Sequence, residues 1–304
     1  MNGGHRPQSA VVIINPLSGH GRQQSHIDAH TALAREVLAS CGISASIRPT
    51  TKAGDAHTFA REAVTAGCDL VVAWGGDGTI NEAASALLHT EIPLGIIPAG
   101  SGNGLASDLL IPFDARAALG LAATGRTMAI DAGQVNECVF FNIAGVGVDA
   151  VIAARFNDRG MKQRGFAAYI QLSTAELLRY RCQTYEISIE HDRAEHRAML
   201  IAFANGRQYG NRLLIAPGAR LDDGLLEIVI VEPQSLASIA WRLPSLFRGT
   251  LQPGRGITMR AASEAWIRTS GVIPFHVDGE PRLGHDELHV QTLPGALRVR
   301  VAAV

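Results

Sequence analysis

The sequence predicts an α/β fold in which an N-terminal, Rossmann-like parallel-sheet domain precedes a C-terminal antiparallel β-sandwich domain. Two observations support this order. Short apolar runs alternate with helical stretches up to Ala129, which is typical of a parallel sheet. Beyond Ile130, strand candidates follow one another with turn residues between them, which is typical of antiparallel sheets. We therefore expect domains over residues 1–129 and 130–304.

The first half predicts an alternation of strands and helices. The expected strands are Ala10–Ile14, Ile43–Ile47, Asp69–Ala73 and Leu94–Ile97. The expected helices are Gln23–Ser40, His57–Ala66, Ile80–Leu88 and one from about Leu105. Apolar runs such as Ala10–Ile14 favour strands that are buried on both faces.

The second half predicts short strands separated by turns such as Asp222-Asp223-Gly224 and Pro294-Gly295. The expected strands are Phe140–Val148, Tyr185–Glu190, Ala198–Phe203, Leu225–Val231, Ala265–Thr269, Phe275–Val277 and Glu287–Thr292. Helical spacing at Gly165–Arg179 and Ser235–Phe247 interrupts this series.

Composition excludes several classes of protein. The net charge is −1, which argues against bulk electrostatic binding to nucleic acid, so no nucleic-acid partner is expected. The polar N-terminus lacks the apolar core of a signal peptide, and no run approaches the ~18 apolar residues that a membrane span needs. The four cysteines show neither metal nor disulfide spacing. We therefore expect a cytoplasmic protein.

Three loops follow predicted strands of the first half: Asn15–Gly19, Gly75–Thr79 and Gly100–Gly104. Loops after parallel strands meet at one sheet edge, where ligands bind. Their glycine, hydroxyl and amide groups suit phosphates. Neither the dinucleotide fingerprint nor the Walker pattern is present, so the sequence predicts a nucleotide site of another design.

Asp77 is the unusual residue of the second loop, because a carboxylate repels phosphate. A carboxylate at this position is explained if Asp77 holds a Mg²⁺ that bridges to the phosphate, or if Asp77 accepts or donates a proton.

An ordered set of motifs resembles the diacylglycerol kinase catalytic family, which also contains sphingosine kinases and bacterial lipid kinases. In the first half these are Asn15-Pro-Leu-Ser-Gly19, Thr50 with Gly54-Asp55-Ala56, Gly75-Gly-Asp-Gly-Thr79 with Asn81-Glu82, and Pro98-Ala-Gly-Ser-Gly-Asn103. In the second half they are Phe141-Asn142, Asn205-Gly206-Arg207, Ala216-Pro217, Asp223-Gly224-Leu225 and Asp278-Gly279-Glu280-Pro281. The set covers nearly the whole chain and most resembles the bacterial lipid-kinase branch.

The resemblance implies an ATP- and Mg²⁺-dependent kinase that phosphorylates a lipid hydroxyl in a cleft between the two domains. It implies ATP contacts at Asn15, Pro16, Leu17, Ser18, Gly19, Thr50, Gly75, Gly76, Asp77, Gly78, Thr79, Ile80, Asn81 and Ser101. It implies catalytic acids at Asp77, Asp278 and Glu280, with Glu280 as the proton acceptor. It also implies a metal site at Arg220, Asp223 and Leu225, where Arg220 and Leu225 contribute backbone carbonyls.

Alternatives to these site assignments stay open from the residues alone. A positioned carboxylate helps an alcohol to attack, and the glycine turn before Glu280 can present one. By composition, however, Asp278-Gly279 is also a hairpin turn, and Asp222-Asp223-Gly224 is also an ordinary turn. The metal of the second domain can be structural or catalytic.

The acceptor is open as well. Many bacterial relatives have an acid where this chain has Gly104, and the change resembles the sphingosine-kinase variant. The candidate acceptors are diacylglycerol, phosphatidylglycerol and sphingoid lipids. NAD kinases and phosphofructokinases also use a loop of this type, so a soluble-metabolite kinase is an alternative. A nucleotide-binding regulator without catalysis is a second alternative.

A lipid acceptor implies transient peripheral contact with a membrane. Two segments mix arginine or lysine with large apolar residues, a combination that suits anionic lipid headgroups. The first contains Arg155, Phe156, Arg159, Met161, Lys162 and Arg164, and the second contains Trp241, Arg242, Leu243, Leu246, Phe247 and Arg248. A solvated charged face and an ordinary packed helix are the alternatives. The sequence does not indicate an oligomeric state.

Overall fold

The computed structural model describes residues 7–18, 24–158, 175–209 and 213–303. The chain forms two compact units, of which the first comprises Met1–Ile130 with Gly295–Val304 and the second Asp131–Pro294. The sequence placed Gly295–Val304 in the second domain. These residues join the first unit because the last strand, β16 (Glu287–Val301), pairs in parallel with β4 (Leu94–Pro98) through Val299 and Leu94.

The first unit has the expected alternation of strands and helices. Its elements before β4 are β1 (Ser9–Ile14), α1 (Gln24–Ser40), β2 (Ser44–Pro49), α2 (Asp55–Thr65), β3 (Leu70–Gly75) and α3 (Asp77–Ala86). After β4 come α4 (Gly104–Asp108) and α5 (Ala115–Thr124). The strands lie in the order β2-β1-β3-β4 and are all parallel, which confirms the predicted Rossmann-like sheet.

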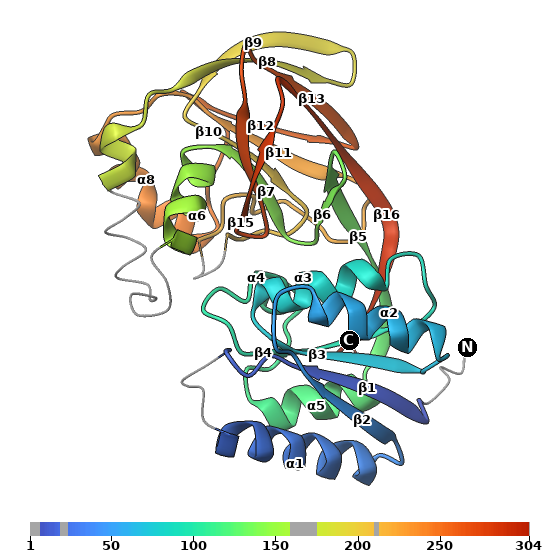
Figure 1. The fold of residues 1–304 in the computed structure, drawn as a ribbon. Helices are drawn as coiled ribbons and strands as arrows, with labels where there is room; N and C mark the ends of the chain where they lie inside the picture. The colour runs from blue at the N-terminus through green and yellow to red at the C-terminus, as the bar shows by residue number, and fades with distance from the viewer. Residues whose placement is uncertain (1–6, 19–23, 159–174, 210–212, 304) are drawn as a thin grey trace. The chain divides into compact units, whose positions relative to one another are not determined.

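Helices cover both faces of this sheet. Figure 1 shows α1 and α5 on one face and α2 and α3 on the other. Every residue of β3 and β4 is buried as a result. Central strands of a parallel sheet therefore read as continuous apolar runs, which is why the sequence identified them.

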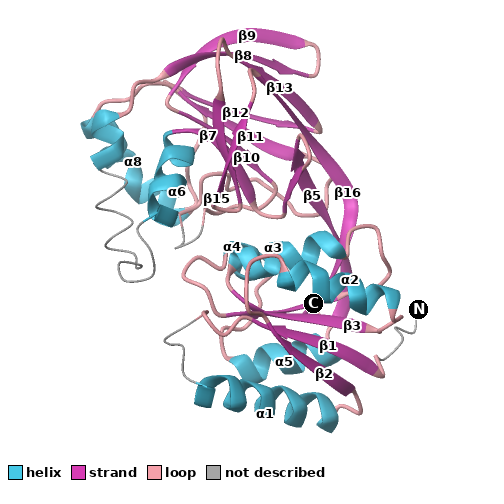
Figure 2. Cartoon of the chain, in the orientation of Figure 1, coloured by secondary structure: helices cyan, strands magenta, loops and turns pink. Residues whose placement is uncertain are grey.

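The second unit is built mainly of strands, as Figure 2 shows. Its first strands are β5 (Arg126–Val135), β6 (Cys138–Phe140) and β7 (Ile143–Gly147). They are followed by β8 (Gln183–Ile189), β9 (Asp192–Ala198), β10 (Leu200–Ala204), β11 (Leu226–Val231), β12 (Ile257–Ala262), β13 (Glu264–Arg268), β14 (Ile273–Val277), β15 (Glu280–Gly284) and β16. The helices α6 (Val148–Asp158) and α8 (Leu236–Arg248) accompany them, and residues 175–179 are also helical.

Two antiparallel layers form the predicted sandwich. One sheet has the order β12-β11-β10-β7-β14-β15, and β16, β13, β8 and β9 pair in the other. Alternate residues of β10 pack into two different hydrophobic cores. Ile201 and Phe203 belong to the core between the two sheets, and Ala202 and Ala204 belong to the core on the helix side. The period of two along a strand explains this division.

Several elements differ from those expected. The strands β5, β9, β12 and β15 were not predicted, and the strand expected at Phe140–Val148 is β7 with only the last residue of β6. The strand β9 is largely exposed and polar, so its sequence lacks an apolar alternation. The strand predicted to end at Thr292 continues through Pro294-Gly295 to Val301. The helix predicted at Gly165–Arg179 lies outside the described residues except at 175–179, which are helical.

No helix among the described residues combines the length and the apolar character that a bilayer crossing requires.

Candidate active site

The three predicted phosphate loops leave the same edge of the first unit's sheet. In the strand register, Ile14 of β1 lies beside Trp74 of β3, and Gly75 lies beside Pro98 of β4. The loops therefore begin at the same level, at the carboxyl ends of parallel neighbours, which is the usual ligand-binding edge. Gly19, the last residue of the first loop, lies outside the described residues.

The first loop is hydrogen-bonded to the start of α3. The Asn15 side chain donates from Nδ2 to Thr79 Oγ1 at 2.9 Å, and its Oδ1 accepts the Leu17 N–H at 2.9 Å. The Gly76 N–H donates to Ser18 Oγ at 3.2 Å. Polar side chains that the sequence assigned to ATP thus also hold the first loop against the second.

Asp77 joins the second loop to the third. Its carboxylate accepts the N–H groups of Asn103 and Gly104, at 2.8 and 2.9 Å. Asn103 adopts the left-handed conformation (φ 53°), and its side chain closes its own loop by bonding both the N–H and the carbonyl of Gly100, at 2.9 and 2.7 Å. Asp77, the carboxylate in a loop predicted to bind phosphate, therefore fixes the backbone at the start of α4.

The glycines allow the second and third loops to approach each other closely. A Cβ on Gly100 would lie 2.6 Å from Gly76 Cα, and a Cβ on Gly102 would lie 2.7 Å from Asp77 Oδ2. A Cβ on Gly75 would lie 2.6 Å from that of Thr79. A larger residue at Gly100 or Gly102 would push the two loops apart, and one at Gly75 would displace Thr79.

Thr50 and the residues after it are attached to the same edge. The buried Thr50 donates its N–H to the carbonyl of Ile14 at 2.8 Å. Glu82 of α3 accepts the N–H groups of Gly54 and Ala56, at 2.9 and 3.2 Å, and so caps the start of α2. The motif of Thr50 and Gly54-Asp55-Ala56 is thus tied to the Asn81-Glu82 motif.

Asp55 closes this turn from the other side. Its Oδ2 accepts the N–H and the hydroxyl of Thr51 and the N–H of Lys52 at 2.7 to 3.0 Å. These hydrogen bonds, chiefly those from Thr51, lower the pKa of the Asp55 carboxyl below its usual value.

The start of α3 is suited to an anion. The helix begins at Asp77, and its N-cap, Gly76, has no side chain with which to satisfy the first-turn N–H groups. The helix dipole adds positive potential at this end. Ile80 is buried beneath it, whereas Ser101 is exposed in the third loop. Phosphate groups are the ligands that such a combination binds most often.

In the second unit, Asp278 and Gly279 form a two-residue hairpin turn between β14 and β15. Both have positive φ, at 47° and 85°, as a type I′ turn requires, and Val277 pairs with Glu280 across it. The Asp278 carboxylate accepts the N–H groups of residues 141, 142 and 143 at 2.9 to 3.0 Å. Asp278 therefore fixes the turn to the segment before β7.

Glu280 is the first residue of β15 and is exposed. The turn thus separates two acids by position: Asp278 points to backbone donors, and Glu280 lies at the surface of the unit.

A buried polar network that the sequence analysis missed supports this turn. His276 and Tyr209 both bond Asp149 Oδ2, at 3.1 and 2.8 Å. The Gly279 N–H donates to His276 Nδ1 at 3.3 Å, which places the ring proton on Nε2, facing Asp149. A buried histidine in the strand before a predicted base is the signal that could have identified it.

The predicted metal residues share one turn. Asp223 Oδ1 accepts the Leu225 N–H at 3.1 Å, and the exposed Arg220 approaches Asp222 Oδ1 at 3.4 Å. The described residues contain no group of three or more Asp, Glu, His or Cys side chains placed to hold a metal ion. A cation here would therefore rely on Asp223 together with backbone carbonyls.

Negative charge gathers behind this turn. The buried Asp131 accepts the Gly224 N–H at 2.7 Å. Burial, together with the charge of Asp223, raises the pKa of the Glu227 carboxyl. Oxygen donors with excess negative charge fit a hard divalent cation.

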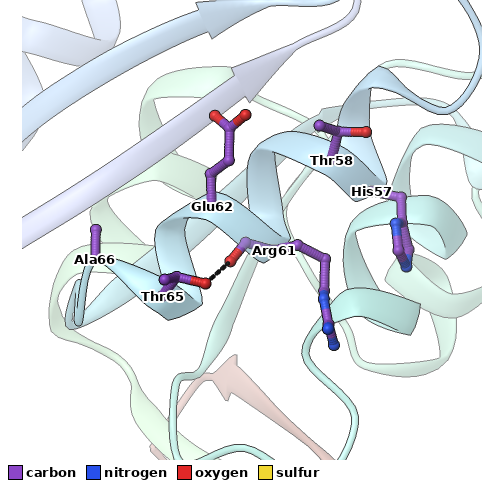
Figure 3. Close-up of a pocket in the computed structure, with 6 residues that line it drawn as sticks. All are labelled: His57, Thr58, Arg61, Glu62, Thr65 and Ala66. Atoms are coloured by element: carbon purple, nitrogen blue, oxygen red, sulfur yellow. Dashed lines mark hydrogen bonds between the residues drawn. The ribbon is translucent and has the colours of Figure 1, made fainter.

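A surface depression of about 500 Å³ lies elsewhere, on α2. Figure 3 shows its lining of His57, Thr58, Arg61, Glu62, Thr65 and Ala66, with Thr65 bonded to the carbonyl of Arg61. All six residues belong to one helix and its C-cap, and none is a predicted site residue. We therefore do not assign the depression to the site.

Comparisons with known proteins agree with the arrangement of motifs. Residues 9–135 match the diacylglycerol kinase catalytic domain, and residues 142–301 match the YegS C-terminal NAD kinase beta sandwich-like domain. The chain is 33% identical to a Citrobacter koseri protein named "Probable lipid kinase YegS-like" and 35% identical to an Escherichia fergusonii protein named "Probable lipid kinase YegS", and each match covers 96% of both chains.

The fold also has a solved counterpart. A crystal structure of a diacylglycerol kinase from Bacillus anthracis is similar to this chain with a TM-score of 0.75, at 20% identity and over 98% of each chain.

Proposed function

The chain belongs to the YegS family of lipid kinases, phosphotransferases with an alcohol acceptor, and from this premise we propose that it transfers the γ-phosphoryl group of ATP to a hydroxyl of a membrane lipid. A diacylglycerol kinase catalytic domain implies that ATP is the phosphoryl donor. The requirement for Mg²⁺, the lipid acceptor and the residue roles below are parts of the proposal.

One observation carries the proposal: three glycine loops are hydrogen-bonded together around the start of α3. Asn15 bonds Thr79, Ser18 bonds Gly76, and Asp77 bonds Asn103. Phosphoryl transfer depends more on positioning and charge neutralisation than on covalent chemistry. A rigid set of backbone donors at a helix N-terminus supplies both for the ATP phosphates.

Mg²⁺ would be held near the phosphates with the participation of Asp77, and near Arg220, Asp223 and Leu225 in the second unit. When bound beside the phosphates, Mg²⁺ neutralises the charge that develops on the phosphoryl oxygens. The proposed role of Asp77 is compatible with its two backbone hydrogen bonds, since each carboxylate oxygen has a second lone pair.

Glu280 is the proposed proton acceptor. The acceptor hydroxyl oxygen forms a bond to the γ-phosphorus while the bond from that phosphorus to the β,γ-bridging oxygen breaks, and the hydroxyl proton passes to the Glu280 carboxylate. ADP leaves with the electron pair of the broken bond. The exposure of Glu280 on a rigid turn supports this assignment, whereas Asp278 is engaged by three backbone N–H groups.

The experiment that tests the function incubates the protein with labelled ATP, Mg²⁺ and separate acceptors: diacylglycerol, phosphatidylglycerol, ceramide, sphingosine and NAD. Label in one or more lipids supports the proposal. Label in NAD alone would establish a soluble-metabolite kinase instead. ATP binding without transfer to any acceptor would establish a regulator.

Replacement of Glu280 tests its role directly. We expect Glu280→Gln to lower kcat by about 10²–10⁴-fold, the usual contribution of a general base, without changing the dissociation constant of ATP. Stopped assays and equilibrium binding measure the two quantities. Near-normal turnover in Glu280→Gln would show that another group accepts the proton.

A further inference from the structure

Helix α8 has a well-defined cap at each end but is only loosely packed against the rest of the second unit. Ser235 caps its start by accepting the Ser238 N–H at 3.2 Å, and Gly249 ends it in the left-handed conformation. It packs on the helix-side core of the second unit through Ile239 and Leu246, yet no residue of the helix is fully buried. The helix is therefore well defined but largely uncovered.

The uncovered face of α8 is more apolar than a solvent-facing helix surface should be. Leu236, Leu243 and Phe247 follow one another at helical spacing and are 45%, 39% and 44% exposed. Trp241 is 86% exposed. A surface helix normally turns its polar residues to water. Exposed apolar side chains gathered on one helix mark a surface that another phase or molecule covers.

The charged residues on and near α8 indicate what kind of surface binds its exposed apolar side chains. α8 contains no acidic residue, and it carries Arg242 and Arg248. The Arg242 guanidinium donates to the carbonyl of the exposed Arg255 at 2.9 Å, which brings a third arginine beside the middle of the helix. The acidic residue Glu232 lies near Gly256. An apolar face with a basic rim is complementary to a bilayer that carries anionic lipids.

We propose that α8 is a membrane-docking helix that lies in the surface of an anionic phospholipid bilayer. Trp241 and Phe247 enter the boundary between headgroups and acyl chains, where tryptophan is favoured. Arg248 and Arg255 contact lipid phosphates. This inference rests on the proposed function, because a membrane-embedded acceptor requires the enzyme to reach the bilayer.

Charge disfavours a second copy of the chain as the cover. In a twofold dimer the same patch faces itself, so the arginines of one copy would oppose those of the other. α8 offers no carboxylate to compensate them, and like charges across an interface are costly.

The test measures binding to phosphatidylcholine vesicles with and without phosphatidylglycerol, by flotation. We expect wild-type protein to bind the anionic vesicles, and Trp241→Ala/Phe247→Ala to lower the partition coefficient by about tenfold or more. Arg248→Gln/Arg255→Gln should remove the preference for phosphatidylglycerol. Val272→Ala, which truncates another exposed apolar residue of the second unit (59% exposed), serves as the matched control and should bind normally.

Tryptophan fluorescence locates the contact. Of the three tryptophans, Trp241 is exposed, Trp266 is half-buried in β13 and Trp74 is buried at 2% exposure, so lipids with brominated acyl chains should quench wild-type emission far more than that of Trp241→Ala. Equal quenching of both proteins, or vesicle binding that is unchanged in Trp241→Ala/Phe247→Ala, would overturn the inference. A wild-type dimer that the same substitutions dissociate would identify a second copy as the cover.

The docking role and the kinase activity can be separated with a water-soluble, short-chain diacylglycerol. We expect the α8 variants to phosphorylate it normally while losing activity on vesicle-borne lipid. Failure of the wild-type protein to phosphorylate any acceptor would reject the proposed function. Normal activity with vesicle binding independent of α8 would reject the docking role alone.

Discussion

Three acids in the family motifs accept hydrogen bonds from the backbone of other segments. Asp77 holds the third glycine loop, Glu82 holds the turn before α2, and Asp278 holds the segment before β7. Hydrogen bonds to ionised acceptors are stronger than neutral ones, so each acid fixes the relative position of two chain segments. The motif acids thus hold together the segments that form the candidate site.

The structural role of Asp77 and its proposed role in holding Mg²⁺ can be separated by measuring ATP affinity with and without Mg²⁺. Asp77→Ala leaves two N–H groups without their acceptor, and we expect ATP affinity to fall by about ten- to a hundredfold. If Asp77 acts mainly by holding the third loop against the second, the loss of ATP affinity will be the same in EDTA and in Mg²⁺. A loss confined to Mg²⁺ would show that Asp77 acts chiefly through the metal.

At the residue scale, sequence predicted where polar groups gather but not what each one contacts. The three loops were expected at one sheet edge because they follow parallel strands, and they lie there. The residues next to Asp77 in the sequence do not show whether its carboxylate faces a cation or the N–H groups of residues 103 and 104. The Asp149–His276 pair was missed because its members are far apart in the sequence.

At the element scale, the close approach of the second and third glycine loops sets a strict limit on side-chain size. A Cβ on Gly100 would lie 2.6 Å from the backbone of Gly76, which has no flexible end that can move away. Gly120, in α5, has no atom within 4 Å of its Cβ position. The two glycines therefore form a matched pair for substitution.

We expect Gly100→Ala to destabilise the protein by about 1–3 kcal/mol and to weaken ATP binding, because the loops must separate. Gly120→Ala should leave ATP binding unchanged and raise stability by about 0.5–1 kcal/mol, since alanine is favoured over glycine within a helix. Chemical denaturation and ATP titration measure both effects. Normal ATP binding in Gly100→Ala would show that the loop spacing is not critical.

Elements with a clear apolar period were predicted well, and those without one were not. The buried strand β3 was identified from its continuous apolar run. β9 was missed because it is a polar strand at the sheet margin, where it pairs with β8. The helix expected from Leu105 is the short α4, and the separate α5 begins at Ala115 after Asp114, which caps it.

At the scale of the whole molecule, the chain passes between its two units twice. β5 contains the boundary between Ile130 and Asp131, and β16 contains that between Pro294 and Gly295. The sequence indicated the first crossing through a change of pattern. It did not indicate the second, because Pro294-Gly295 suggests a turn, whereas β16 continues through it with Gly295 at a φ of 58°.

The returning segment supplies core to the first unit. Leu297, Val299 and Val301 are 0%, 0% and 5% exposed, and Val299 pairs with Leu94 at the margin of the parallel sheet. Burial of such side chains contributes about 1.5–3 kcal/mol each, which together is comparable with the total stability of a domain. The N-terminal segment alone therefore lacks part of its own core.

Deletion of Gly295–Val304 should consequently unfold the first unit while the second, which retains the β13 pairing of β16, stays folded. The change should appear as a red shift of Trp74, which is buried and stacks on His30 at 4.3 Å, and as rapid proteolysis confined to the region before Ile130. Deletion of Ala302–Val304, beyond β16, should have little effect because Ala302 and Ala303 are exposed. If the chain without Gly295–Val304 still binds ATP and keeps Trp74 buried, the first unit does not depend on the returning strand.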